Sequence, residues 1–263
     1  MSTFAILGAT GQTGQQLTKL ILLNPSNKLN LYVRSESKLL ALFPDLKSNK
    51  NVTIFSGSLS DVNLIKECTS NTKAVFSVLA SNENLPGMTI ARDAAACILA
   101  ALRKMKEEDK NVKLPRVVVL SSASLNPLLY NNGPWFVHVV IYNAFWHIYQ
   151  DLEKAVKLYE AAQQDGLDVD VKYIQPGALV EGDGCGSVKL TKEEYSPVVA
   201  YGELALAMLM AAEDEGLNWR DVGVLITGEE SQLPKGLPLV VMGGLGWSFM
   251  PWVMRALRGL GVV

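Results

Sequence analysis

Apolar runs and helical segments alternate along most of this 263-residue chain. Apolar runs bounded by turn-forming residues predict strands within residues 3–10, 29–34, 51–57, 73–81 and 116–124. Segments with apolar residues at three- and four-residue steps separate these runs, and MTIARDAAACILAALRKM is the longest of them. Such alternation is typical of a parallel sheet that is covered by helices on both faces.

We therefore predict an α/β fold, a doubly wound or Rossmann-type parallel sheet with helices on both faces and a small C-terminal elaboration. No internal repeat, low-complexity tract or linker divides the sequence. The length suits one domain with additions, so residues 1–263 are predicted to form a single domain.

Composition narrows the functional classes. Apolar residues make up 49% of the chain and charged residues 19%, with a net charge of −2, so there is no basic surplus for binding nucleic acid. The three cysteines are widely spaced, which favours free thiols in a reducing compartment over a disulfide framework or a metal site. The first residues, MSTFAILGAT, do not resemble a secretory signal, and we expect a cytoplasmic protein.

The C-terminal segment is unusually apolar. Residues 237–254 carry no charge, which reaches the length of a membrane-spanning helix. Prolines and glycines are expected to break such a helix, and they stand at Pro238, Gly243, Gly244, Gly246 and Pro251. We favour a packed cap or a subunit contact over a span. Arg255 and Arg258 beside Trp252 keep an interfacial membrane contact open, and the sequence leaves both a monomer and a homodimer open.

The turn after the first predicted strand carries the clearest chemical signal. Its sequence is GATGQTG at residues 8–14, between a strand and a helix. Glycines allow a tight turn and a close approach of the backbone to a pyrophosphate, and the helix N-terminus offers free N–H groups. A dinucleotide site is therefore predicted. Its contacts are expected from Gly8, Thr10, Gly11, Gln12, Thr13 and Gly14.

The end of the second strand indicates which dinucleotide binds. An acidic residue there would favour NAD, but the chain has Arg34 followed by Ser35. A guanidinium suits a 2′-phosphate, so we predict NADP(H), although Arg34 could instead pair with Glu36. Further contacts with the cofactor are predicted for Ser58, Leu59 and Ala80, after the third and fourth strands. Asp61 could mark a contact with the adenine through its backbone neighbours Leu59 and Ser60, and it could equally be a plain helix N-cap.

Three motifs together resemble a known family. GATGQTG at 8–14, VVVLSSASL at 117–125 and YIQPGAL at 173–179 resemble the atypical short-chain dehydrogenase/reductases of the NmrA-like group. More narrowly, SSASLNP with the following aromatic stretch and the apolar tail is similar to the fungal averufin oxidase A family. The resemblance implies an NADP-linked tailoring oxidoreductase of polyketide biosynthesis that acts on an anthraquinone- or xanthone-like small molecule. It also implies that Pro176 and Gly177 lie beside the nicotinamide.

Ser121 and Ser122 stand where this superfamily places its catalytic serine, just after the fifth strand. A hydroxyl there faces the crevice in which ligands bind. The alternative is that both serines satisfy backbone groups at the strand end. Ser124 is the weaker candidate because it is further from the strand. Segments around 126–150, 178–200 and 230–263 are expected on the substrate side.

The superfamily's Tyr-x-x-x-Lys dyad is absent. Tyr149 and Lys154 are five residues apart, which places them on different faces of a helix. Tyr149 falls in an aromatic stripe that is typical of a core or of a pocket wall. His147 and Asp151 fall in a polar stripe, and we predict that they pair as a proton carrier. A solvated helix face is the alternative interpretation.

Three functions therefore compete. We favour an NADP-dependent oxidoreductase that uses Ser121 or Ser122, with His147, Tyr149 and Asp151 as further catalytic candidates. The second is a dehydratase or isomerase on the same scaffold. The third is an NADP-sensing regulatory protein, which would bind the cofactor without turnover.

Overall fold

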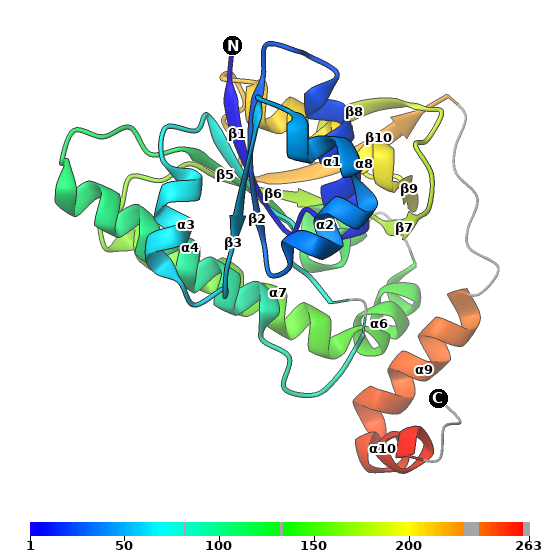
Figure 1. Cartoon of the computed structure of the whole chain (residues 1–263). Helices are drawn as coiled ribbons and strands as arrows, with labels where there is room; N and C mark the ends of the chain where they lie inside the picture. Colours follow the sequence, from blue (N-terminus) through cyan, green and yellow to red (C-terminus); the bar gives the residue numbers. More distant parts are fainter. Residues whose placement is uncertain (82, 132–133, 229–236, 260–263) are drawn as a thin grey trace.

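The computed structural model describes residues 1–81, 83–131, 134–228 and 237–259, whose strands form a mainly parallel sheet (Figure 1). The strand order is β3-β2-β1-β4-β5-β6-β10-β8. Only β10 and β8 pair antiparallel in this sheet. The doubly wound α/β prediction is confirmed. The strands are β1 (Thr3–Leu7), β2 (Lys28–Val33), β3 (Val52–Ser56), β4 (Ala74–Ser77), β5 (Arg116–Leu120), β6 (Val171–Gln175), β8 (Ser187–Thr191) and β10 (Asp221–Thr227).

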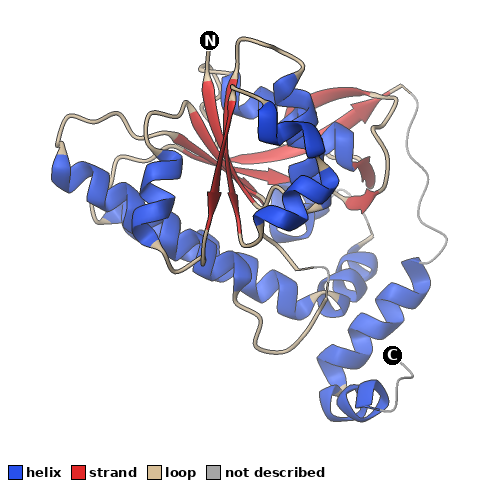
Figure 2. Ribbon diagram, viewed as in Figure 1, coloured by secondary structure: helices blue, strands red, loops and turns tan. Residues whose placement is uncertain are grey.

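Helices cover both faces of this sheet (Figure 2). One face is covered by α1 (Gln12–Leu22), α2 (Glu36–Leu42) and α8 (Tyr201–Glu213). The other is covered by α3 (Val62–Thr69), α4 (Ile90–Glu108) and α7 (Trp146–Gln164). The central strands are therefore buried on both sides, which explains why they read as continuous apolar runs rather than as an alternating pattern.

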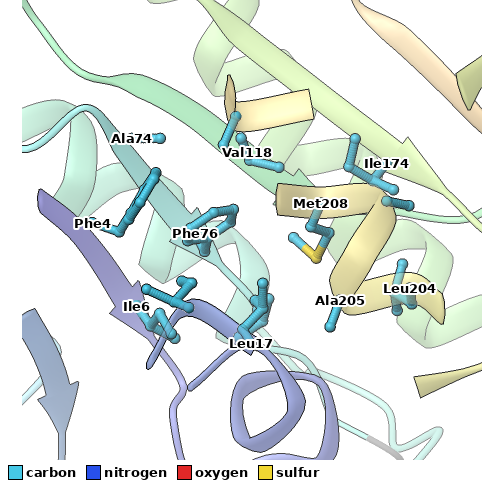
Figure 3. Packing of buried hydrophobic residues seen from close by; sticks show 14 of the residues in the cluster. Phe4, Ile6, Leu17, Ala74, Phe76, Val118, Ile174, Leu204, Ala205 and Met208 are labelled. Atoms are coloured by element: carbon cyan, nitrogen blue, oxygen red, sulfur yellow. The ribbon is translucent and has the colours of Figure 1, made fainter. Parts of the chain in front are cut away.

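The core beneath α1 and α8 fixes these helices on the sheet. The rings of Phe4 on β1 and Phe76 on β4 lie 5.9 Å apart, centre to centre. Leu17 of α1 and Met208 of α8 are fully buried in the same cluster (Figure 3). Burial of a side chain of this size contributes about 1.5–3 kcal/mol. This packing holds the N-terminus of α1 at the carboxyl end of β1.

Smaller elements surround the carboxyl edge of the sheet. Two short strands pair in parallel, namely β7 (Ala178–Val180) and β9 (Val198–Ala200). The remaining elements are η1 (Pro44–Ser48), η2 (Ala123–Leu125), α5 (Pro127–Tyr130), α6 (Trp135–Ala144), α9 (Leu237–Phe249) and α10 (Pro251–Gly259). The segments predicted on the substrate side contain several of these elements. Positions 132–133, 230–236 and 260–263 of those segments lie outside the described residues.

The apolar tail forms two helices, and one sequence expectation about it is wrong. The glycines at 243, 244 and 246 do not break α9, although Pro251 does begin a new helix. A side chain at Gly244 would overlap the carbonyl oxygen of Ala144 in α6. Close packing against α6 therefore offsets the low helix propensity of glycine. No helix among the described residues is long and apolar enough to cross a membrane.

The predicted pairing of His147 with Asp151 is also wrong. The Asp151 carboxylate is 3% exposed and accepts hydrogen bonds from the backbone N–H groups of Ala91 (2.8 Å) and Arg92 (3.1 Å). These donors belong to the first turn of α4, whose own N-cap residue, Thr89, makes no capping bond. A buried carboxylate is stabilised when it accepts hydrogen bonds from the otherwise unpaired N–H groups at a helix N-terminus. Asp151 therefore joins α7 to α4.

We predict that Asp151→Ala lowers the free energy of unfolding by about 2–4 kcal/mol, because two charge-assisted hydrogen bonds are lost, and the buried N–H of Ala91 and the partly buried N–H of Arg92 lose their partner. Asp151→Asn keeps one acceptor, and we expect about half that loss. Urea denaturation measures both changes.

Asp165→Ala is the matched control. It removes a carboxylate from the end of the same helix, where the bridge to Arg103 is exposed to solvent. Its effect should stay below about 1 kcal/mol. An Asp151→Ala variant as stable as this control would contradict the capping role.

Candidate active site

The carboxyl ends of the parallel strands meet at one edge of the sheet. The connections reverse direction between β1 and β4, which are neighbours, and ligands of such sheets bind at this switch point. Every strand from β1 to β6 leads directly into at least one predicted site residue. After β1 comes the turn 8–14, after β2 Arg34 and Ser35, after β3 Ser58 and Leu59, after β4 Ala80, after β5 Ser121 and Ser122, and after β6 Pro176 and Gly177.

The glycine turn has the steric properties that a pyrophosphate site needs. Gly8 adopts φ +107°, a conformation that other residues rarely adopt. A side chain at Gly14 would overlap the carbonyl of Gly8 and lie 2.8 Å from the Cα of Ala9. The N-cap of α1 is Gly11, which has no side chain to cap the helix. The first N–H groups of α1 are therefore available to an anion.

The remaining turn residues differ in exposure. Thr13 is buried, whereas Gln12 is exposed and its amide nitrogen lies 3.4 Å from Glu181 Oε1. Thr10 is partly buried, and its carbonyl accepts a hydrogen bond from the Gln15 side chain. Side-chain hydrogen bonds of Gln12 and Gln15 thus stabilise the turn, and the backbone N–H groups at the start of α1 face the switch point.

Arg34 is exposed at the end of β2. Among the described residues it has no hydrogen-bond or ion-pair partner, and Glu36 does not pair with it. Ser35 caps α2 by accepting a hydrogen bond from the N–H of Lys38. Dinucleotides bound to sheets of this kind place the adenosine ribose near the end of the second strand, which is where the guanidinium and the cap lie.

The loop after β3 is held by the sheet. The Tyr32 hydroxyl donates a 2.6 Å hydrogen bond to the carbonyl of Ser58. Asp61 accepts from the N–H of Leu64 and caps α3, which favours the plain N-cap interpretation of this residue. Ser58 and Leu59 are thereby placed on the same edge as Arg34.

Three hydroxyl groups come together after β5. Ser122 Oγ donates to the Tyr149 hydroxyl at 3.5 Å, and that hydroxyl donates to Ser124 Oγ at 3.2 Å. Tyr149 is 7% exposed. Burial raises its pKa above the usual value, hydrogen bonds with Ser122 and Ser124 oppose the rise, and the nearby Tyr195 adds to it. We call Ser122, Ser124 and Tyr149 the hydroxyl cluster.

The Ser121 side chain is not part of the hydroxyl cluster. Its backbone N–H bonds to the carbonyl of Ile174, and its hydroxyl is buried without a hydrogen-bond partner among the described residues. Successive residues of an extended chain face opposite ways, so only one of the two adjacent serines can reach Tyr149. The sequence ranks Ser124 below both serines because it is further from the strand, but a 3-10 turn brings it back to the Tyr149 hydroxyl.

The expected lysine partner of Tyr149 is absent, as the spacing indicates. Lys154 is exposed, whereas Tyr149 is buried. The position one turn after Tyr149 holds Glu153, which accepts hydrogen bonds from the Tyr142 hydroxyl (2.7 Å) and the Gln150 amide (3.2 Å). Burial, and then Glu153, raise the pKa of Tyr142 to about 12.

His147 lies at the other end of this region. Its Nε2 is 3.3 Å from the carbonyl oxygen of Trp247 in α9, and its backbone N–H donates to Asn84 Oδ1 at 2.9 Å. The Asn84 amide donates in turn to the carbonyl of Ala144 at 2.7 Å. Asn84 therefore joins the loop after β4 to α6 and α7. Nothing in the sequence distinguished this residue.

A hollow of about 980 Å³ lies beside α5 and residues 193–197, and Tyr195 in its wall is the residue that adds to the rise in the pKa of Tyr149. Asn126 fixes one side, because it caps α5 and donates to the Gln175 side chain at 2.8 Å. On the opposite side, Gly177 lets the segment at Ser196 and Pro197 pack closely against it, since a side chain at position 177 would overlap their backbone. The lining residues are Pro127, Leu128, Asn131, Glu193, Glu194, Tyr195, Pro197 and Leu225.

Comparison with known proteins agrees with this geometry. A family model described as NAD(P)H-binding matches residues 8–214. Oxidoreductase ordB of Dothistroma septosporum is 36% identical over 97% of this chain and 94% of its own length. Oxidoreductase aflX of Aspergillus parasiticus is also 36% identical, over 97% of this chain and 95% of its own length.

The fold has solved counterparts. A short-chain dehydrogenase/reductase from Veillonella parvula, solved in complex with NADP, superposes with a TM-score of 0.66 at 20% identity. The match covers 89% of this chain and 99% of that one. The predicted dinucleotide binding and the oxidoreductase class are confirmed. The chain belongs to the NAD(P)H-binding family and is an NAD(P)-dependent oxidoreductase.

Proposed function

We propose that the protein uses NADPH to reduce a carbonyl group on a hydrophobic aromatic polyketide of the anthraquinone or xanthone type. The hydroxyl cluster carries this proposal, because its Tyr149 has a raised pKa that keeps the phenol protonated at neutral pH, and Tyr195, which acts on that pKa, lines the hollow. The relatives ordB and aflX are oxidoreductases that match along almost the whole chain, which supports the same class of reaction.

The cofactor residues fit NADPH. The glycine turn and the N-terminus of α1 would hold the pyrophosphate, Arg34 and Ser35 the 2′-phosphate, and Pro176 and Gly177 would lie beside the nicotinamide. The bound nicotinamide supplies a hydride to the carbonyl carbon. Tyr149 donates a proton to the carbonyl oxygen, while Ser122 and Ser124 hold the phenol in place.

The missing lysine favours reduction over alcohol oxidation. A cation next to Tyr149 would favour the phenolate, which is the base that alcohol oxidation needs. This chain has Glu153 at that position, and burial raises the pKa of Tyr149. Tyr149 therefore stays protonated at neutral pH. A protonated phenol can stabilise a developing alkoxide but cannot remove a proton from an alcohol.

The hollow suits a flat polyphenol. Pro127, Pro197 and Leu225 present apolar surface to the rings. The carboxylates of Glu193 and Glu194 line the same hollow and would accept hydrogen bonds from phenolic hydroxyl groups. The unpaired cysteines at 68, 97 and 185 suit a reducing cytosol, where we place the reaction.

We predict that Arg34→Asp weakens NADPH binding relative to NADH by about tenfold to a hundredfold, because charge-assisted hydrogen bonds to the 2′-phosphate are replaced by repulsion. Titration of the quenching of protein fluorescence by each nucleotide measures both affinities. Lys47→Asp makes the same charge change at an exposed lysine of η1 and should leave the preference unaltered. An unchanged preference in Arg34→Asp would refute the assignment of the 2′-phosphate site.

We predict that Tyr149→Phe lowers kcat about a hundredfold or more, with NADPH affinity unchanged, because the proton donor is removed and the fold is kept. The measurement is the loss of nicotinamide absorbance with a panel of hydroxylated anthraquinones and xanthones. Tyr159→Phe removes another buried hydroxyl from the same helix and should retain full kcat.

The pH profile distinguishes a proton donor from a purely structural tyrosine. With the pKa of Tyr149 raised, the reductive kcat should stay level up to about pH 10, the usual tyrosine pKa, and fall only above it. A kcat that rises as pH passes from 7 to 9 would indicate a phenolate base, and full activity in Tyr149→Phe would remove this residue from the mechanism.

A further inference from the structure

Large apolar side chains gather on the exposed surface of three helices, α6, α9 and α10. Helices α6 and α9 pack against each other, and α10 follows α9, on the side away from most of the sheet (Figure 1). We call the exposed residues of this surface the apolar platform. They are Trp135, Phe136, Val137, Val139 and Val140 of α6, together with Leu239, Val240, Met242, Phe249, Met250 and Trp252 of the tail.

The helices that carry the platform are nearly free of charge, and their two charged residues are both arginines of α10. Residues 127–150 contain no Asp, Glu, Lys or Arg, and residues 237–259 contain only Arg255 and Arg258. Charged residues form 19% of the whole chain, so an ordinary surface of this length would hold about nine. Arg258 pairs with Glu83 at 3.3 Å, and Arg255 is exposed.

The apolar character of these helices is not explained by burial in the core. Helix α9 has no charged residue on any face, a composition expected of a helix surrounded by apolar material. Helix α6 covers one side of α9, where Gly244 is in close contact with Ala144, and α7 and α10 make smaller contacts with it. The outer side holds Leu239 at 74% exposure, and Trp252 of α10 is exposed to the same extent.

We propose that the apolar platform docks the protein on an anionic lipid surface as a peripheral membrane contact. Neither α9 nor α10 can span a bilayer, so the helices would lie in the plane of the interface with their apolar side chains below the headgroups. Exposed tryptophans such as Trp135 and Trp252 are favoured at that depth.

Charge favours lipid over a second copy of the chain. The whole chain has a net charge of −2 and the platform contributes two arginines, so the rest of the molecule carries −4. Anionic headgroups would attract the platform and repel the remainder, which sets one orientation. In a symmetric pair of platforms, by contrast, Arg255 would meet helices that hold no acidic residue, because Glu83 is already paired with Arg258.

Co-sedimentation with vesicles of phosphatidylcholine and phosphatidylserine tests the proposal. We expect the full-length protein to bind them, and to bind pure phosphatidylcholine vesicles less. Trp252→Glu should reduce the partition coefficient at least about tenfold. Arg255→Gln should reduce it about fivefold on anionic vesicles alone, which corresponds to roughly 1 kcal/mol per basic residue near the surface.

Leu23→Glu is the matched control, because Leu23 is a 78% exposed apolar residue at the end of α1, outside the platform. It should bind vesicles like the original protein, and NADPH binding should be unchanged in all three variants. Failure of the original protein to bind anionic vesicles would overturn the proposal. So would sedimentation equilibrium showing a dimer that Trp252→Glu dissociates, since the platform would then be a subunit interface.

Discussion

The close approach of α1 to the end of β1 is the constraint on which the site depends. No side chain fits at Gly14, because it would overlap the backbone of Gly8 and Ala9. The core beneath α1, with Leu17 against the sheet, holds the helix in this position. The free N–H groups of α1 therefore lie at the switch point between β1 and β4, and a dinucleotide bound there must extend along the edge where Ser122 and Tyr149 stand.

Long-range hydrogen bonds position α7, the helix that carries Tyr149, on that edge. Asp151 anchors α7 to the first turn of α4, and Asn84 binds the start of α7 to the loop after β4. Tyr149 lies between these two anchors, two residues from Asp151. Its orientation is thus set by backbone capping, and it does not require the lysine that related enzymes place one turn later. Loss of that lysine leaves a rigidly held phenol with a raised pKa.

The features that the sequence predicts are those that depend on residues close together in the chain. Strand and helix alternation, the glycine turn, Arg34 at the end of β2 and serines at the end of β5 all depend on neighbours within a few residues. The separation of Tyr149 from Lys154 also follows from helical geometry alone, and the burial of one and exposure of the other agree with it. These features give the fold class and the cofactor.

Tertiary partners explain what the sequence does not predict. Asp151 pairs with backbone groups about sixty residues away, not with the histidine one turn before it, because the first turn of α4 offers it otherwise unpaired N–H groups, while the imidazole of His147 lies against Trp247 of α9. Asn84 and Ser124 acquire their roles only through contacts across the fold. Helix α9 continues through its glycines because α6 packs against Gly244 and Met254 of α10 packs against Gly246, and these contacts cannot be predicted from the number of glycines in the segment.

The most direct test of carbonyl reduction at this edge is the fate of a labelled hydride. NADPH deuterated at the transferable position of the nicotinamide would be incubated with the protein and an accepted anthraquinone, and the product analysed by mass spectrometry. We predict that one deuterium enters the product for each NADP⁺ formed. Product that forms without deuterium while NADPH is unchanged would contradict a redox mechanism and indicate proton-transfer chemistry on the same scaffold.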